Sequence, residues 1–418
     1  MEPDPRPGSP RNPAALHSRA GLCERCLRHP RNGVEQMKWA TYFAVSAAVV
    51  IVGLSLGVTL PLVSFRLEAW GYGPFAIGVM AAMPAVGVLL GARLTGHLAG
   101  WFGTPQTLRL CLLASAVSVG LLSVMPSYPL WLLLRLLIGI SLTVVFVLGE
   151  SWINQLVEDR LRGRLVALYG TGFALSQLCG PLLLTLIGTE SDHGFWFSAG
   201  LLVAGCLLLL GHDGAPKVDA QSASGRGVLV FCRTSPAIAW AVVLFAAFEA
   251  MVLTLLPVYL LREGFAQQLA LIMVSTVVVG DAALQLPIGW LADRVPRQTL
   301  FRCCGVVLLG SSLSIPVVLH TPLIWPVLVL FGASAGGLYT LSLILVGQRY
   351  RDDALVRANA HIALLWGAGC LLGPLSTGAA SQWVSGHALP VLMALGAAFF
   401  VWLAFRRGAF SEALPAKA

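Results

Sequence analysis

Two stretches of the chain follow the same outline: RLVALYGTGFALSQLCGP at residues 164–181 and RANAHIALLWGAGCLLGP at residues 357–374. Each begins with Arg and ends with Gly-Pro, and the two lie 193 residues apart. A repeat of this length predicts a chain built from two related halves. The same offset joins three further pairs: Gly87 with Gly280, Arg109 with Arg302, and Gly139 with Gly332.

The surrounding sequence is too apolar for a water-soluble domain. Of the 418 residues, 57% are hydrophobic and 11% are charged, and the mean hydropathy is +0.80. Soluble domains carry about 25% charged residues. Apolar runs of about 20 residues, long enough to cross a bilayer as a helix, recur along the chain. We predict twelve such spans: 39–64, 75–96, 108–125, 130–148, 165–188, 195–211, 237–261, 269–291, 300–319, 323–346, 358–380 and 389–405.

These runs are continuously apolar, whereas the strands of a membrane β-barrel alternate between apolar and polar residues. We therefore predict an all-α polytopic membrane protein, with twelve transmembrane helices in two pseudo-symmetric six-helix halves. The halves are expected at 39–211 and 237–406, joined by a polar cytoplasmic linker at 212–236. A disordered basic tail is expected at 1–38, and a short tail at 407–418.

The net charge of +8 reflects where the basic residues lie along the chain. They concentrate in alternate loops, which by the positive-inside rule places both termini in the cytoplasm. The basic balance therefore requires no nucleic-acid partner. No cleavable signal peptide is expected before the first span, and Met37 is a plausible alternative start of translation. The basic loops are 160–164, 217–233, 294–302, 349–357 and 406–417.

The nine cysteines are scattered, mostly within the predicted spans, and indicate no disulfide framework. Cys23, Cys26 and His29 would supply only three of the four ligands that a structural zinc ion requires. We therefore expect neither a metal site nor a cofactor.

The loop Gly289-Trp-Leu-Ala-Asp293-Arg294-Val-Pro-Arg297 lies between the predicted eighth and ninth spans. It resembles the Gly-x-x-x-Asp-Arg-x-Gly-Arg signature of the major facilitator superfamily, with Pro in place of the last Gly. The resemblance implies a transporter that alternates its access between the two sides of the membrane. It also implies that this loop latches the cytoplasmic gate. The first half has Gly100 where the signature has Asp, so only the second half keeps the charge.

The cytoplasmic gate is therefore expected to depend on Asp293. Its expected partner is the start of the fifth span, near Arg164, and Glu150 at the end of the fourth span is a second gate or packing residue. An ordinary loop charge is the alternative interpretation of Asp293.

Two further motifs resemble superfamily motifs of the fourth and fifth spans. Leu134-Arg135 with Gly139 resembles the arginine motif of the fourth span, although Arg135 could instead extend to the nearby membrane surface. The fifth-span sequence resembles a motif associated with antiporters, which favours export, but two leucines replace its last glycines. Helix packing is the alternative interpretation of this fifth-span motif, because the predicted eleventh span contains a similar pattern of glycine and proline. The residues concerned are Gly172, Gly180 and Pro181, repeated at Gly373 and Pro374.

The sequences Gly149-Glu150-Ser-Trp152 and Gln285-Leu-Pro287 resemble a bacterial branch of the superfamily often called YcaD-like. This resemblance implies a multi-pass protein of the bacterial inner membrane. It leaves the substrate open.

Two acidic residues, Glu249 and Asp281, each lie about twelve residues into a predicted span, near the middle of the bilayer. Such positions are costly for a charged group and are usually functional. Carboxyl groups shielded from water can bind and release protons near neutral pH. We expect Glu249, and secondarily Asp281, to couple transport to protons, with Arg135 as a possible counter-charge to Glu249. A structural carboxyl group bonded to a neighbouring helix is the alternative.

Other polar side chains within the spans are candidates for a substrate-binding cavity. His361 could relay protons, although a single His among small residues is more often a packing residue. The cavity candidates besides Arg135 and His361 are Gln177, Tyr339 and Trp366.

The sequence as a whole predicts a monomeric secondary active transporter of a small organic solute, proton-coupled and exporting. The alternatives are an uptake symporter of a small metabolite and a transporter-like sensor that binds solute without moving it. An enzyme is not expected, since neither a His-Glu-x-x-His zinc motif nor a second intramembrane Asp is present. A phosphate-binding loop is also absent, which leaves ion gradients as the energy source.

Overall fold

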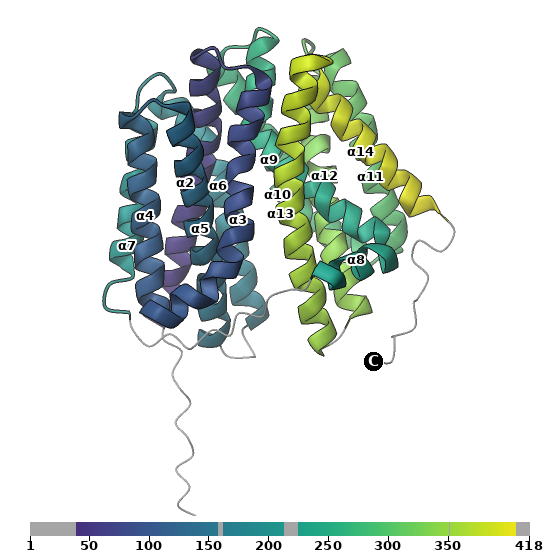
Figure 1. Ribbon diagram of the computed structural model, residues 1–418. Coiled ribbons are helices and arrows are strands. Elements are labelled where there is room, and N and C mark those ends of the chain that lie inside the picture. The colour runs from purple at the N-terminus through teal and green to yellow at the C-terminus, as the bar shows by residue number, and fades with distance from the viewer. Residues whose placement is uncertain (1–38, 158–161, 213–224, 351, 407–418) are drawn as a thin grey trace, which may run out of the picture. The chain divides into compact units, whose positions relative to one another are not determined.

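Every secondary-structure element in the described part of the chain is an α-helix, as expected where lipid cannot satisfy backbone polar groups (Figure 1). The computed structural model describes residues 39–157, 162–212, 225–350 and 352–406. The side chains of a few helical positions inside these ranges are likewise not described. The helices are α2 (Trp39–Ala69), α3 (Pro74–Phe102), α4 (Thr104–Val124), α5 (Tyr128–Leu156), α6 (Arg162–Ile187), α7 (His193–Leu208), α8 (Gly225–Thr234), α9 (Pro236–Arg262), α10 (Gln267–Ala292), α11 (Arg297–Val318), α12 (Ile324–Arg349), α13 (Asp352–Trp383) and α14 (Ala388–Phe405).

The predicted spans correspond to these helices one for one, apart from α8. Eleven of the described helices are long and apolar enough to cross a membrane, and α7 is an apolar helix of 16 residues. Several helices continue past the apolar runs. For example, α5 extends to Leu156, because polar residues such as Glu150 remain compatible with a helix once it leaves the hydrocarbon. Helix α8 lies within the predicted linker and was not expected.

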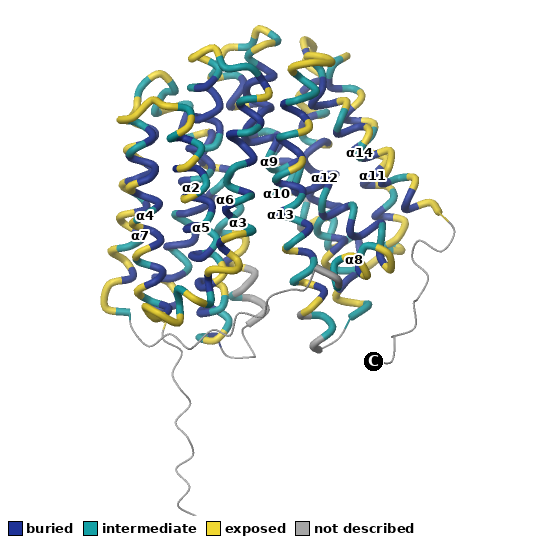
Figure 2. The backbone as a smooth tube through the Cα atoms, in the orientation of Figure 1, coloured by how far each residue is buried: buried dark blue, intermediate teal, exposed yellow. Residues whose placement is uncertain are grey.

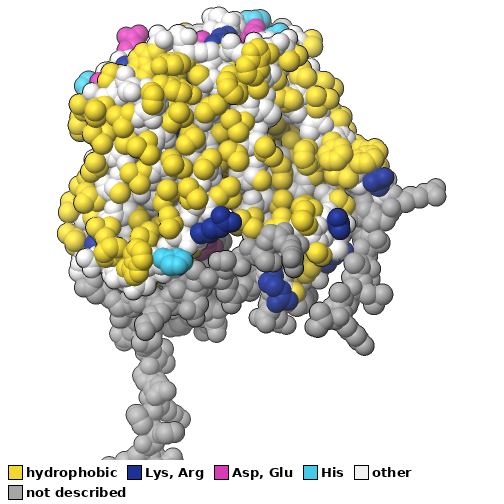
Figure 3. Space-filling model, in the orientation of Figure 1, with side chains coloured by type: hydrophobic (Ala, Val, Ile, Leu, Met, Phe, Trp, Pro, Cys, Tyr) yellow, Lys and Arg dark blue, Asp and Glu magenta, His cyan; other side chains and the backbone are white. Residues whose placement is uncertain are grey.

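The outer surface between the two ends of the helices is apolar. Figure 3 shows hydrophobic side chains over the middle of one face, with most of the visible charged side chains near the two ends. Leu186 is 83% exposed and Val317 is 80% exposed. Figure 2 shows that buried residues lie on the inner sides of the helices. Two shallow grooves on α4, against α7 and against α5, are also lined by apolar residues. Such a surface is suited to contact with lipid chains.

The internal repeat appears directly in helix packing. In the first helix group, α2–α7, α3 packs against α5, and Gly87 lies on the backbone around Gly139. In the second group, α9–α14, α10 packs against α12 in the same way, with Gly280 on Val329 and Gly332 on Val277. The pairs α4–α7 and α11–α14 also correspond. The glycine pairs that the sequence repeat identified therefore make equivalent helix contacts.

The two copies of the signature loop differ in backbone. Only Gly103 separates α3 from α4, and its φ of 78° is a conformation that glycine adopts far more readily than other residues. In the second copy, residues 293–296 connect α10 to α11. Gly289 lies within α10 and a side chain there would meet open space, so this glycine is not required for a tight turn.

The helix ends form two faces. We call the end containing Arg66, Asp192 and Arg262 the Arg66 face, and the opposite end, containing Asp293 and Arg294, the Arg294 face. Helices of the two groups meet through α3 with α13 and through α6 with α10. In Figure 1, α3 and α13 approach each other near the Arg66 face and diverge toward the Arg294 face.

The contacts that join the two groups near the Arg66 face are polar, aromatic and steric. Glu68 pairs with Arg262, and the Thr189 hydroxyl donates a hydrogen bond to Gln267. The rings of Phe75 and Trp383 have centroids 4.9 Å apart, Gln382 lies against Gly73, and Gly78 lies on the backbone of Gly378. This set of contacts closes the boundary between the groups at the Arg66 face.

Replacing Gly180 by valine is expected to destabilise the fold. Gly180 lies directly on the backbone of Gly57 in α2, so a Cβ there would overlap main-chain atoms that cannot rotate away. Overpacking of this kind costs about 1–3 kcal/mol or more. Thermal unfolding in detergent measures the effect. Gly170→Val, in the same helix but with open space around it, is the matched control, and equal melting temperatures for the two variants would contradict the packing argument.

Candidate functional site

Five polar or aromatic residues from five helices gather around the middle of the bundle. Glu249 is the central residue of α9, about 20 Å from either end of that helix. All five residues are half-buried and lie deep between helices. Besides Glu249, the members of this central cluster are Gln177 on α6, Asp281 on α10, Tyr339 on α12 and Trp366 on α13.

Glu249 lies at the boundary between the two helix groups. Its carboxylate is close to the side chains of Trp366, in the same group, and Gln177, in the other group, and both side chains carry N–H groups able to donate to it. The neighbourhood is tightly packed, since Ala85 of α3 contacts Ala246 of α9 and Cys370 of α13. A change at Glu249 therefore acts on a contact between the groups.

Asp281 supplies a second carboxylate close enough to interact with the charge of Glu249. Its Oδ1 atom accepts a hydrogen bond of 2.9 Å from Nε2 of Gln285, one turn along α10. It also lies against α12 at Gly336, where a Cβ would overlap the carboxylate. The absence of a side chain at Gly336 thus makes room for Asp281.

Aromatic rings form one wall beside the acidic pair. The rings of Tyr339 and Phe245 stack with centroids 4.6 Å apart and planes 16° from parallel. Phe248 continues this wall, 6.2 Å from Phe245, and meets Phe331 edge-on at 5.0 Å. The Tyr339 hydroxyl lies near enough to Glu249 to interact electrostatically with its carboxylate. The cluster therefore combines carboxylates with flat apolar surface.

Arg135 lies apart from this cluster, about 10 Å along α5 from its end at the Arg66 face. The residue is 1% exposed, so it does not extend to the membrane surface. Among described residues, none of its three guanidinium nitrogens has a hydrogen-bond partner. The polar side chains beside Glu249 are those of Gln177 and Trp366, and no ion pair between Arg135 and Glu249 occurs in the described part of the chain.

His361 and Glu150 also lie outside the central cluster. The His361 ring faces Phe231 of α8, with centroids 5.8 Å apart. Glu150 is exposed six residues before the end of α5.

The residues of the signature loop lie at the Arg294 face. The Asp293 side chain is 75% exposed and pairs with Arg297 at 3.3 Å, within the same loop region. The guanidinium of Arg294 lies 3.5 Å from the ring centroid of Trp290. The side chain of Arg164, at the start of α6, lies outside the described residues. In this conformation, Asp293 pairs with Arg297, which belongs to the same helix group.

The glycine and proline motifs of α6 and α13 lie at helix contacts. Gly172 faces Val50 of α2, with a Cβ position 3.1 Å from its Cγ2 atom, and Gly180 lies on Gly57. The corresponding residues of α13 make similar contacts: Gly373 lies against Ala247 of α9, and the Pro374 carbonyl lies against Gly78 of α3. Pro181 is buried within α6.

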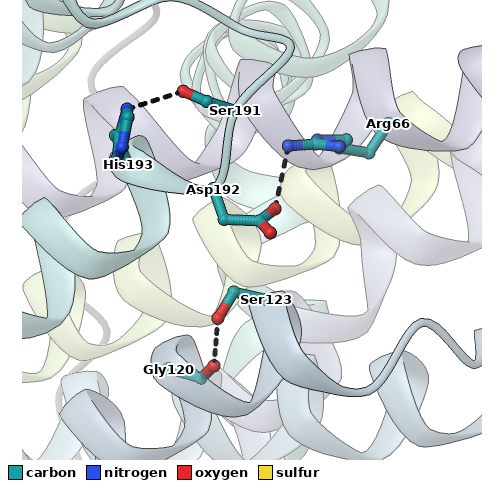
Figure 4. Close-up of polar contacts among 6 residues, drawn as sticks. All are labelled: Arg66, Gly120, Ser123, Ser191, Asp192 and His193. Carbon is teal, nitrogen blue, oxygen red and sulfur yellow. Dashed lines mark hydrogen bonds and ion pairs between the residues drawn. The ribbon is translucent and has the colours of Figure 1, made fainter.

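Two arginines at the Arg66 face lie at equivalent helix ends, but they form ion pairs with residues of different helix groups. Arg66 at the end of α2 pairs with Asp192, which precedes α7 in the same group, at 2.8 Å (Figure 4). Arg262 at the end of α9 binds Glu68 of the other group through two hydrogen bonds, of 3.0 and 2.8 Å. His387 precedes α14 where Asp192 precedes α7.

The exchange of Asp192 for His387 explains the difference. His387 cannot offer Arg262 a carboxylate, and its Nδ1 atom lies 3.0 Å from the Tyr259 hydroxyl and 3.4 Å from Glu263. Arg262 is therefore free to reach Glu68. Arg66 and Arg262 lie 196 residues apart, three more than the repeat of 193, so the sequence could have indicated that these two arginines correspond. Their acidic partners are visible only in the structure.

Comparison with known proteins identifies the family. A family profile described as Major Facilitator Superfamily matches residues 45–280 and 264–417. The chain belongs to the major facilitator superfamily. This superfamily protein is similar to an uncharacterized MFS-type transporter, YcaD, of Escherichia fergusonii, at 25% identity over 350 residues, covering 83% of this chain and 91% of the relative. A YcaD of Salmonella arizonae is 25% identical over 348 residues, covering 83% and 90%.

Solved structures support the same fold for this superfamily protein. A bacterial homolog of the human lysosomal transporter Spinster, described as inward-facing and occupied, aligns with a TM-score of 0.72 at 15% identity over 92% of this chain and 100% of that one. The nucleoside transporter NupG gives 0.69 at 17% identity, covering 90% and 98%. A D-xylose-proton symporter gives 0.66 at 16% identity, covering 86% and 97%. The chain is therefore a multi-pass membrane transporter of the superfamily.

Proposed function

We propose that the protein is a secondary active transporter that moves a small organic solute by alternating access, coupled to protons through Glu249. The observation that carries this proposal is the position of Glu249, at the middle of α9 and beside Gln177 of the other helix group. A carboxylate at this depth is costly unless it has a proton or ligand role. One of the fold neighbours is described as a proton symporter, so the architecture supports coupling in that protein.

The coupling follows from the chemistry of the carboxyl group. Ionised Glu249 can accept hydrogen bonds from the neighbouring Gln177 and Trp366, and charge-assisted bonds of this kind are stronger than neutral ones. Adding a proton removes the charge and turns one oxygen into a donor, which weakens the contact between the groups. Proton binding at Glu249 thus changes the free energy of separating the two groups near the cluster.

We assign the Arg294 face to the cytoplasm, because the basic residues Arg233, Arg297 and Arg349 lie at helix ends on this face. Both termini are then cytoplasmic, and the Arg66 face is external. With the group boundary closed at the Arg66 face, this conformation is inward-facing. The exposed position of Asp293 fits this state, since a cytoplasmic latch between Asp293 and the start of α6 would form only when the transporter opens outward.

The two rocking units are proposed to be residues 39–211 and 237–406, with α8 in the segment between them. Export is the favoured direction, with a bacterial inner membrane as the location. The lipid bilayer surrounds the protein, and a single chain contains the complete central cluster.

A flux measurement tests this function. The purified full chain is reconstituted in proteoliposomes, and a panel of radiolabelled organic solutes is screened with an inside-acidic pH gradient. We expect gradient-dependent accumulation of at least one solute, which nigericin abolishes by exchanging protons for potassium. Flux of the same solute that ignores both the gradient and nigericin would contradict proton coupling.

A further inference from the structure

We propose that the solute is an organic cation with an aromatic or apolar body, and that it competes with protons for the Glu249–Asp281 pair. This inference rests on the transporter function proposed above and names the substrate class of the same site. It follows from the charges that face the central cluster and from the rings beside it.

Glu249 and Asp281 lie near the middle of α9 and α10, two helices in contact, so their charges interact. The polar side chains beside them are neutral: Gln177 and Trp366 near Glu249, and Gln285, which donates a hydrogen bond to Asp281. Neutral donors reduce but do not cancel two neighbouring negative charges. A site of this kind is best satisfied by protons or by a cationic ligand.

The titratable groups that surround the acidic pair supply no positive charge. Those that interact with Glu249 from neighbouring helices are the Tyr339 hydroxyl of α12 and the Cys370 thiol of α13, neither of which carries positive charge. The more distant Glu150 of α5 is also acidic. Arg135 is buried elsewhere in α5, and His361 faces Phe231. Within the described residues, no cation of the protein pairs with either carboxylate.

The site also has a flat aromatic surface. The stacked rings of Tyr339 and Phe245 form one wall, and the Trp366 indole lies close to Glu249. Aromatic faces attract cations because their π-electrons are negative at the centre of the ring. A carboxylate pair beside such faces is complementary to a cationic amine or onium group attached to an apolar body.

The direction of coupling follows from competition between protons and the cation for the two carboxylates. When a proton binds an oxygen of Glu249 or Asp281, the negative charge that holds the cation is lost and the cation is released. When the proton leaves, the cation can bind again. A site that holds one or the other exchanges external protons for internal cations, which corresponds to export under an inward proton gradient.

Equilibrium dialysis of tetraphenylphosphonium against the purified, detergent-solubilised full chain tests this inference. This probe is a permanent cation with four phenyl rings, and tetraphenylborate is an anion of the same shape. We expect saturable binding of the cation at pH 8 and at least about tenfold weaker binding of the anion. If one proton displaces one cation, the dissociation constant rises about tenfold per pH unit in the acidic range.

Variants locate the binding to the acidic pair. Glu249→Gln and Asp281→Asn, made separately, are each expected to weaken tetraphenylphosphonium binding about tenfold or more. Glu190→Gln, on the exposed loop between α6 and α7, is the control and keeps wild-type affinity. Size-exclusion profiles and melting curves verify folding. If one acidic variant fails to fold, the other still decides the question.

Three results would overturn the inference: equal affinity for the anion, affinity that is independent of pH, or folded acidic variants that bind as the wild type does. The binding measurement needs no transport, so its outcome is separate from the flux measurement. Proton-driven flux of an anionic or neutral solute without cation binding would refute the substrate class alone. Cation binding without proton-driven flux would refute the coupling alone.

Discussion

Replacing Glu249 by glutamine is expected to abolish solute accumulation driven by a pH gradient. Glutamine has nearly the same shape and can still form hydrogen bonds with Gln177 and Trp366, but it cannot bind and release a proton. A gradient of one pH unit stores about 1.4 kcal/mol per proton, which supports an accumulation ratio of about tenfold for one-to-one exchange. In proteoliposomes, that ratio should fall to one in the Glu249→Gln variant.

Counterflow separates lost coupling from lost folding. Exchange of labelled for unlabelled solute needs no net proton movement, so at saturating solute the Glu249→Gln variant should still perform it. Glu190→Gln, which removes an exposed carboxylate outside the cluster, should behave as the wild type in both assays. A Glu249→Gln variant that still accumulates solute about tenfold would refute the role of Glu249.

Reversing the charge at Arg262 is expected to open the Arg66 face. Arg262 and Glu68 connect the two helix groups through two hydrogen bonds, and their side chains are 40% and 24% exposed. A partly exposed pair contributes up to about 1 kcal/mol, and Arg262→Glu adds repulsion, so the ratio of closed to open states should fall about tenfold. Cross-linking of Phe75→Cys to Trp383→Cys in a background without other cysteines reports closure, because these rings meet across the boundary.

The internal repeat provides a matched control for this experiment. Arg66 has the equivalent position in α2, but its partner Asp192 belongs to the same helix group. Arg66→Glu should therefore leave the cross-linking yield almost unchanged, whereas Glu68→Arg combined with Arg262→Glu should restore it. Equal loss of cross-linking in the two single variants would show that general charge at this face, and not the Arg262–Glu68 pair, holds it closed.

The fold could be predicted closely from the sequence for two reasons. A membrane-spanning chain requires long apolar helices, and the internal repeat indicates that the helices form two groups of six. Helix α8 was missed for a physical reason. It is short and amphipathic, with apolar residues such as Leu229 and Phe231 among polar neighbours, so it resembles a linker in any test for membrane spans.

The candidate site was only partly predictable. Depth along a helix follows from counting residues, so Glu249 and Asp281 could be placed near the middle of the bilayer. The partners of a carboxylate depend on how helices rotate and cross, which no pattern within one helix determines. The sequence therefore suggested Arg135 as a counter-charge to Glu249, whereas the structure brings Gln177 and Trp366 to it.

Alternating access itself is tested most directly by distances across the two faces in the reconstituted protein. Electron paramagnetic resonance can measure the distance between two spin labels on each face. One pair is placed at Glu190 and Gln268 on the Arg66 face, and the other at Gly100 and Gln298 on the Arg294 face. All four positions are exposed. Raising and lowering the pH is expected to change the two distances in opposite directions, and Glu249→Gln should remove this pH dependence. Distances that change in the same direction, or a pH response that Glu249→Gln leaves intact, would contradict exchange of access controlled by Glu249.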